Sequence, residues 1–295
     1  MRWAWPFNAR DSGDRHEEGH RFPTRRAGPD FLCIGAHKAG STWLYQQLDS
    51  HPDFWMPPVK ELHYFDQLSR VQRTTHPRCR DDRDRRFLER LKSLSAEPGI
   101  DLKNYGRLFE SKASLFSGDI SPNYSTLSDE VIREIVGYFP NLKVIFLARD
   151  PVERVWSHLS MEVSYRQIEP FDPTDINEVD RNLSRRGLLL RSYPSAIVAR
   201  WKRIVEPKQF RVYFFDDLQN DPAELRRSVL SFLGADPDKA SKRFSVDHNS
   251  WTGMEKLTLT DKVRSHLAQF FKKELKTCAA RLGGPAKDWP GRYGF

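Results

Sequence analysis

The sequence has few cysteines and no long apolar run. Three cysteines, Cys33, Cys79 and Cys278, are spread over 295 residues. Their wide spacing fits no zinc or disulfide framework, so we expect a reducing compartment, the cytoplasm. No apolar run approaches the ~18 residues of a membrane span, and the N-terminus lacks the apolar core of a signal peptide. We therefore expect no transmembrane segment.

Acidic residues are in deficit as well, because 40 of them face 48 lysines and arginines, for a net charge of +8. This excess favours an anionic partner without deciding between a nucleotide, a glycan, a membrane surface and a nucleic acid. With 38% apolar residues the chain can bury one sizeable core. Residues 1–28 are polar, charged and aperiodic, which predicts a disordered tail before a single domain over 29–295.

The tail contains a literal match to the HExxH zinc-protease pattern, from His16 to His20. That chemistry needs a stable helix that places both histidines on one face. Here Gly19 interrupts a segment that has no apolar stripe, so we expect no metal site.

The stretch from Phe31 to Leu48 predicts a strand, a phosphate loop and a helix that starts at Ser41 or Thr42. Backbone N–H groups and the positive end of the helix dipole would converge on an anion there. The spacing Gly35-x-x-x-x-Gly40 matches the loop of nucleotide hydrolases, but Ser41 stands where their lysine should follow. The alternative is a strand-to-helix turn that binds nothing.

Further strands and helices alternate along the chain. Strands are predicted within 115–122, at 143–148 and at 210–215, and helices at about 128–139, from 151, at about 193–204, from 222 to 233 and from 261 to about 282. This order with crossovers requires an α/β fold with a mainly parallel sheet.

Two further blocks carry chemistry. The segment from Val59 to Asp66 places Glu61 and His63 among aromatic residues, although it also suits a partly buried edge with solvated charges. Arg149 follows the clearest buried strand, and Ser157 lies two turns into the next helix, so both would face the crevice where open α/β sheets bind ligands. The alternative is that Arg149 pairs with a neighbouring acid and merely caps the sheet.

The segment from Arg70 to Arg90 is crowded with arginine, with aspartates between. It reads either as a solvated face or as a contact surface for an anionic acceptor. The sequence leaves the choice open.

The run Lys-Ala-Gly-Ser-Thr-Trp from Lys38 to Trp43 resembles the 5′-phosphosulfate loop of sulfotransferases, which use 3′-phosphoadenosine 5′-phosphosulfate (PAPS). The segment from Glu61 to Asp66 is similar to the Glu-x-His-x-Phe-Asp segment of glycan and heparan-sulfate-type members, and Arg-Asp-Pro-x-x-Arg-x-x-Ser from Arg149 is similar to the family's 3′-phosphate block. The resemblance implies a P-loop NTPase-like three-layer fold, with a mainly parallel central sheet flanked by helices.

It also implies sulfuryl transfer from PAPS to a hydroxyl or amine of a glycan, lipid or small molecule. The implied catalytic residues are Glu61 as base, Lys38 and His63. The implied donor-binding residues are Lys38, Ala39, Gly40, Ser41, Thr42, Trp43, Arg149, Ser157 and Tyr193.

The sequence departs from the family at three places. Ile120 stands where a lysine is common, only Lys256 remains of the basic loop expected between 247 and 256, and Cys278 alone cannot form the disulfide of animal glycan enzymes. The acceptor and the oligomeric state stay open, with an anionic glycan among the candidates and no nucleic acid expected. The rival readings are a P-loop kinase-like enzyme and a non-catalytic nucleotide- or polyanion-binding module.

Overall fold

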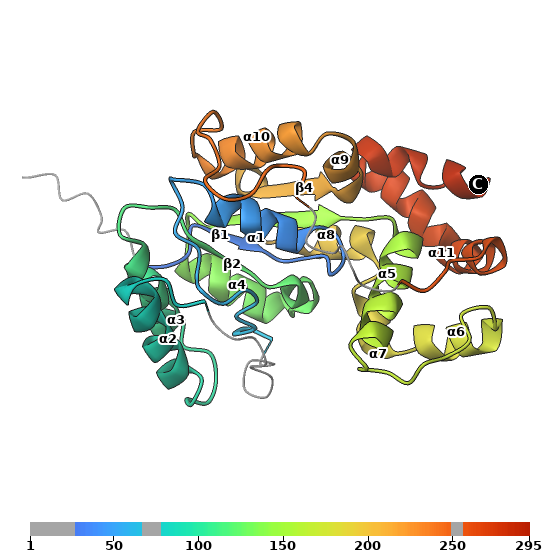
Figure 1. Ribbon diagram of the computed structural model, residues 1–295, viewed down its shortest axis with the longest axis horizontal. Helices are drawn as coiled ribbons and strands as arrows, with labels where there is room; N and C mark the ends of the chain where they lie inside the picture. Colours follow the sequence, from blue (N-terminus) through green and yellow to red (C-terminus); the bar gives the residue numbers. More distant parts are fainter. Residues whose placement is uncertain (1–26, 67–77, 249–255) are drawn as a thin grey trace, which may run out of the picture.

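The computed structural model describes residues 27–66, 78–248 and 256–295 (Figure 1). The predicted tail up to residue 26, with its HExxH match, lies outside the described residues, as do Arg70 and Arg73. Gly28 is part of the folded body, because it is buried and its carbonyl accepts a hydrogen bond from Lys112 Nζ at 2.8 Å.

A four-stranded parallel sheet runs through the middle of the molecule in the order β2-β1-β3-β4. The strands are β1 (Phe31–Cys33), β2 (Gly118–Ile120), β3 (Lys143–Ala148) and β4 (Phe210–Phe214). Leu32 pairs with Asp119 on one side and with Val144 on the other. The predicted parallel sheet is confirmed, and its strands are largely buried because helices cover both faces.

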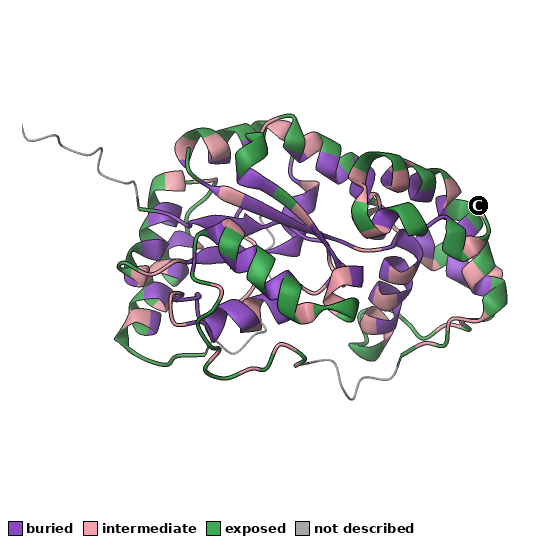
Figure 2. Ribbon diagram, turned by 90° about the horizontal axis from the view of Figure 1, so that it is seen from above, coloured by how far each residue is buried: buried purple, intermediate pink, exposed green. Residues whose placement is uncertain are grey.

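The helices pack around this sheet, with buried sides inward and exposed sides outward (Figure 2). They are α1 (Ser41–Asp49), α2 (Asp82–Leu94), α3 (Leu102–Leu108), α4 (Asp129–Tyr138), α5 (Pro151–Ser164), α6 (Ile176–Leu183), α7 (Arg186–Leu190), α8 (Pro194–Lys202), α9 (Phe215–Asn220), α10 (Pro222–Leu233) and α11 (Asp261–Leu282). The predictions for α1, α4, α5, α8, α10 and α11 are confirmed to within about two residues.

The last helix closes one end of the core. Thr260 caps α11, and buried side chains such as Leu267, Phe271 and Leu275 pack against α5 and α8. In the described part of the chain, no helix is both long enough and apolar enough to cross a membrane.

The sequence did not predict α2, α3, α6, α7 and α9. Of these, α2 and α3 lie together beyond the β2 side of the sheet (Figure 1). In α2 the buried residues Phe87, Leu91 and Leu94 fall on one side of a helix that is otherwise strongly charged. This apolar stripe of three residues is what holds the arginine-rich segment against the body of the protein.

Candidate functional site

The loop between β1 and α1 ends in a helix N-terminus without a side-chain cap. Gly40 is the N-cap residue, with φ 97°, and no side chain bonds to the first-turn amides. Because this φ lies in the left-handed region, glycine is favoured at position 40, and a Cβ there would lie 2.6 Å from Cδ2 at the flexible end of Leu218. The first-turn N–H groups are therefore placed to receive an anion.

One amide of the predicted set points elsewhere. The Ala39 N–H donates to the Ala36 carbonyl at 3.3 Å, within the loop. The predicted contact between the Ala39 N–H and a phosphate group is therefore not supported, because this N–H is bonded within the loop. The donors at the helix start are the amides of Gly40, Ser41 and Thr42.

Lys38 and Arg149 meet at this loop, although they are 111 residues apart in the sequence. Arg149 Nη1 donates to the Lys38 carbonyl at 2.6 Å, and the guanidinium lies 4.1 Å from the ring centroid of Phe215. The Nε of Arg149 is buried and has no hydrogen-bond partner among the described residues. The contact ties the end of β3 to the loop, and the Nε–H of Arg149 remains for a ligand.

The alternative reading of Arg149, an ion pair with a neighbouring acid, is not what the structure has. Asp150 instead caps α5 through the Val152 N–H at 2.9 Å and accepts from the Tyr293 hydroxyl at 2.9 Å. Glu153 pairs with Arg264 at 2.6 Å. Burial lowers the pKa of Arg149, as expected for a cation that awaits a counter-charge.

The positive charges around the loop act on Lys38. Burial first, and then Arg149 and Lys256, lower the pKa of Lys38 to about 8. Lys256 is the predicted remnant of the family's basic loop, and the next residue is fixed on α5, because Trp156 Nε1 donates to the Leu257 carbonyl at 2.8 Å. The structure thus brings Lys256 within electrostatic range of Lys38.

The other residues predicted to bind PAPS are Ser157, Trp43 and Tyr193, and their surroundings in the structure differ. Ser157 is half-buried on α5, with no side-chain hydrogen bond among the described residues. Trp43 is 7% exposed, and its Nε1 donates to the Val246 carbonyl at 2.8 Å. Tyr193 packs on Phe271 with ring centroids 5.9 Å apart, and within the described residues it makes no hydrogen bond, ion pair or ring contact with the loop.

Glu61 and His63 lie in a segment of unusual backbone, with φ of 65° and 52°. Lys60 Nζ bonds to Glu61 Oε1, and His63 Nε2 lies 3.3 Å from Glu61 Oε2. The other ring nitrogen of His63, Nδ1, lies 2.8 Å from Asp66 Oδ2. The histidine is thus clamped between two carboxylates. The sequence pattern assigns Asp66 no role, and its spacing of three residues from His63 is the signal that could have indicated this contact.

The contacts set the protonation of both groups. Burial disfavours the Glu61 carboxylate, but Lys60 and His63 outweigh it and hold the pKa of Glu61 well below its usual range. Burial likewise opposes the charged form of His63, yet Asp66 and Glu61 raise the pKa of His63 to about 9. At neutral pH this segment therefore presents a carboxylate beside an imidazolium, whereas an unperturbed histidine has a pKa near 6.5.

Two arginines that sequence reasoning left without a role add positive charge. Arg154 is fully buried on α5, and its Nη2 donates to Ser192 Oγ at 2.5 Å and to the Leu188 carbonyl at 3.2 Å. Arg191 has a buried Nε without a partner, and its pKa is lowered by burial while Asp66 opposes the shift. Within the described residues neither arginine has a carboxylate within salt-bridge distance.

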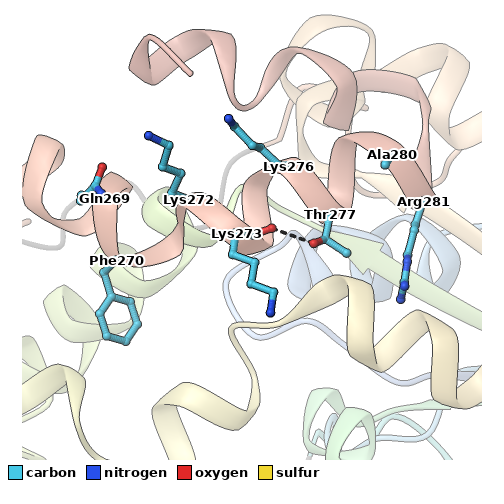
Figure 3. A pocket seen from close by; sticks show the side chains of 8 residues that line it. All are labelled: Gln269, Phe270, Lys272, Lys273, Lys276, Thr277, Ala280 and Arg281. Atoms are coloured by element: carbon cyan, nitrogen blue, oxygen red, sulfur yellow. Dashed lines mark hydrogen bonds between the residues drawn. The ribbon is translucent and has the colours of Figure 1, made fainter.

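The surplus of cations, the uncapped α1 and the orphaned Arg149 Nε together fit a ligand with more than one phosphate-like group. A hollow on the outer face of α11 is separate from this site (Figure 3). Its lining residues lie on α11 between Gln269 and Arg281 and include Lys273 and Lys276, and none of them belongs to the loop, the 60–66 segment or the 149–157 block. The candidate site is therefore defined by the contacts of the loop, the 60–66 segment and the 149–157 block, and not by this hollow.

The described part of the arginine-rich segment is largely neutralised by acidic residues, some within the segment and some outside it. Arg80 pairs with Asp49 and, at 2.7 Å, with Asp84, while Arg83 pairs with Asp81 at 2.9 Å. These pairs favour the reading as a structural and solvated face over a surface for an anionic acceptor.

A family model described as "Sulfotransferase family" matches residues 29–239. Human bifunctional heparan sulfate N-deacetylase/N-sulfotransferase 3 is 25% identical over 221 residues, which is 71% of this chain and 22% of that protein. The human enzyme numbered 2 of the same name is 23% identical over 305 aligned positions, 88% of this chain and 30% of that protein. The chain thus spans less than a third of the length of these curated relatives.

Solved structures show the same fold. A sulfotransferase from Alicyclobacillus acidocaldarius superposes with a TM-score of 0.66 at 20% identity, over 89% of this chain and 99% of that one. The sulfotransferase domain of the curacin biosynthetic pathway follows with a TM-score of 0.51 at 18% identity, over 84% and 98%. The predicted P-loop-like α/β architecture is confirmed.

Proposed function

Because the chain belongs to the sulfotransferase family, we propose that it moves a sulfuryl group from PAPS to a hydroxyl or amine of an acceptor. The observation that carries this proposal is the uncapped N-terminus of α1, with Lys38 beside it and Arg149 Nη1 on the Lys38 carbonyl. PAPS would supply the activated sulfuryl group. The roles that we propose below for the residues of the chain do not involve a metal.

The donor's two ends would be held by different elements. The amides of Gly40, Ser41 and Thr42 and the Lys38 ammonium would bind the 5′-phosphosulfate, because a helix N-terminus and a cation both favour an anion. Arg149 and Ser157 would bind the 3′-phosphate, since each has a side-chain donor without a hydrogen-bond partner among the described residues. Trp43 and Tyr193 remain candidates for the adenine.

Glu61 would act as the general base. The bond between sulfur and the bridging phosphate oxygen breaks, a bond from sulfur to the acceptor oxygen or nitrogen forms, and the acceptor proton passes to Glu61. Lys38 would stabilise the charge that develops on the bridging oxygen. His63, held as an imidazolium by Asp66 at 2.8 Å, would keep Glu61 ionised and in place.

For the acceptor we propose a glycan that carries negative charge. The two human relatives are named as heparan sulfate N-sulfotransferases, and the cations Lys60 and Arg191 lie within electrostatic range of Glu61. All three cysteines are free, which supports a cytoplasmic, reducing location as our proposal.

Calorimetry with 3′-phosphoadenosine 5′-phosphate (PAP) beside magnesium ATP tests the donor. We expect binding of PAP and little of magnesium ATP, and the reverse preference would support the kinase-like alternative. Transfer from labelled PAPS to N-desulfated heparan sulfate, with its N-acetylated form as matched control, tests the acceptor amine. Equal labelling of both glycans would indicate that the acceptor group is a hydroxyl. No labelling despite tight PAP binding would favour a non-catalytic binding module.

A further inference from the structure

A buried carboxylate lies directly behind the proposed catalytic segment. Asp119, in β2, is 1% exposed and accepts three hydrogen bonds from hydroxyl groups. Ser121 Oγ donates to its Oδ1 at 2.7 Å, and the hydroxyls of Tyr124 and Tyr105 donate to its Oδ2 at 2.7 and 3.0 Å. Burial raises the pKa of Asp119, while the three donors oppose the shift.

Two of those three hydroxyls also accept hydrogen bonds, and both donors are backbone amides of the catalytic segment. The His63 N–H donates to Ser121 Oγ at 3.3 Å, and the Tyr64 N–H donates to the Tyr124 hydroxyl at 3.0 Å. These contacts span 58 and 60 residues of sequence. The Tyr105 hydroxyl, by contrast, bonds to Asp119 but to no backbone amide of residues 61–64 within the described chain.

The direction of each bond follows from the chemistry of a hydroxyl group. A hydroxyl has one hydrogen to donate and two lone pairs to accept with. Because Asp119 takes the hydrogens of Ser121 and Tyr124, their lone pairs are left to receive the amides of His63 and Tyr64. A carboxylate imposes this direction on both hydroxyls, whereas an amide side chain could donate to one of them and reverse it.

The catalytic segment needs such support, because its backbone is unfavourable on its own. Glu61 and His63 both have φ in the left-handed region, at 65° and 52°, and neither is glycine. Such conformations persist only where the surrounding contacts enforce them, and they are frequent at functional sites. The two amide contacts fall directly on this strained stretch.

We propose that Asp119, acting through Ser121 and Tyr124, is a positioning residue that fixes Glu61 and His63 in their working geometry. This inference rests on the proposed function, in which Glu61 is the base. Asp119 is buried behind the segment and would contact neither PAPS nor the sulfuryl acceptor. Breaking the relay, the hydrogen bonds that run from Asp119 through Ser121 and Tyr124 to the amides of residues 63 and 64, should therefore lower turnover and leave the affinity for PAPS unchanged. Misplacement of a reacting group by about 1 Å can cost about 10²-fold in rate.

The matched pair of variants is Tyr124→Phe and Tyr105→Phe. Both tyrosines are fully buried, and each variant removes one hydroxyl that bonds to Asp119 Oδ2 and keeps the ring. Only Tyr124→Phe also removes the acceptor of the Tyr64 N–H. We expect kcat to fall about 10- to 10²-fold in Tyr124→Phe and to stay within about threefold in Tyr105→Phe, with PAP affinity unchanged in both. Equal loss of kcat in the two variants would overturn the proposal.

Ser121 supplies a second test, which applies even if the variant Tyr124→Phe does not fold. Ser121→Ala removes the acceptor of the His63 N–H, and Ser121→Thr restores a hydroxyl at the same place. We expect loss of kcat in the first variant and recovery in the second. Full kcat in Ser121→Ala would contradict the relay.

The double variant Glu61→Gln with Tyr124→Phe separates this inference from the proposed function. If the relay acts through Glu61, Tyr124→Phe should cause no further loss once Glu61 is replaced. Wild-type turnover in the single variant Glu61→Gln would refute Glu61 as the base. The relay would then be tested by comparing kcat in Tyr124→Phe with kcat in Tyr105→Phe. A full additional loss in the double variant would refute the relay alone.

Discussion

Replacing Glu61 by glutamine is the sharpest test of the proposed chemistry. The change keeps the shape of the side chain and its ability to accept a hydrogen bond from Lys60, but it removes the negative charge and the proton acceptor. If Glu61 is the base, kcat should fall by about 10²- to 10⁴-fold while donor affinity stays nearly constant.

The structure also fixes what the neighbouring histidine can do. His63 Nε2 lies 3.3 Å from Glu61 Oε2, a separation at which opposite charges attract by about 5 kcal/mol for an effective dielectric constant of about 20. About a quarter of each side chain is exposed, so solvent screens part of this energy. The attraction favours the charged form of both groups, which is why the pKa of Glu61 is lowered and that of His63 is raised to about 9.

These shifts predict different pH profiles for the two possible bases. A Glu61 base would be ionised throughout the neutral range, because its pKa lies below the ordinary 4.5, so kcat should not rise between about pH 6 and 8 on its account. A His63 base would become active only as it loses its proton, near pH 9.

Single-turnover transfer with saturating PAPS, measured from pH 6 to 10, separates these cases. We expect a flat profile at neutral pH for the native chain, a severe loss in Glu61→Gln and a smaller loss in His63→Ala. Substantial activity in Glu61→Gln, together with a limb that rises near pH 9 and disappears in His63→Ala, would assign the base to the histidine.

The other predictions concern the donor and the arginine-rich segment. Arg149→Ala or Ser157→Ala should reduce the preference for PAPS over adenosine 5′-phosphosulfate by at least about tenfold, measured as the ratio of kcat/KM values, and an unchanged ratio would remove that residue from the 3′-phosphate site. Because the pKa of Lys38 is about 8, kcat/KM for PAPS should fall above that pH as the ammonium is lost, and Lys38→Arg should abolish this limb. Neutralising Arg83 and Arg85 together should leave acceptor affinity and its salt dependence unchanged, since both already pair with aspartates, and a steep loss for an anionic glycan would restore the acceptor-surface reading.

The fold could be predicted because its signals are local. The strand Lys143–Ala148 is a continuous β-branched and apolar run, and the helix Asp261–Leu282 has a regular apolar stripe and a capping threonine. The strand, loop and helix of residues 31–49 could be predicted as well, since glycine spacing, small residues and one lysine lie within a few positions. In each case the physical cause lies within one turn or one strand of the residue concerned.

The arrangement behind Glu61 could not be predicted, because its causes are distant in the sequence. Nothing near residue 61 indicates that its backbone takes φ 65°, or that the following amides bond to Ser121 and Tyr124. For the same reason the raised pKa of His63 could not be predicted, since it depends on how an irregular segment folds two carboxylates around one ring. Arg80 is similar, because its partner Asp49 precedes it by 31 residues.

Arg149 shows how the structure changes the interpretation of a residue whose role the sequence had suggested. Its Nη1 already supports the Lys38 carbonyl, so Arg149→Ala removes a loop contact as well as a proposed phosphate ligand. It also removes the second-largest influence that lowers the Lys38 pKa, so the alkaline limb of kcat/KM should move to higher pH in this variant. Ser157 has no side-chain hydrogen bond among the described residues, and its replacement by alanine isolates the 3′-phosphate contact. If Arg149 acts only on the nucleotide, both variants should lose the same preference and Lys38 should titrate unchanged. A shifted limb in Arg149→Ala alone would show that the arginine also sets the charge state of the loop.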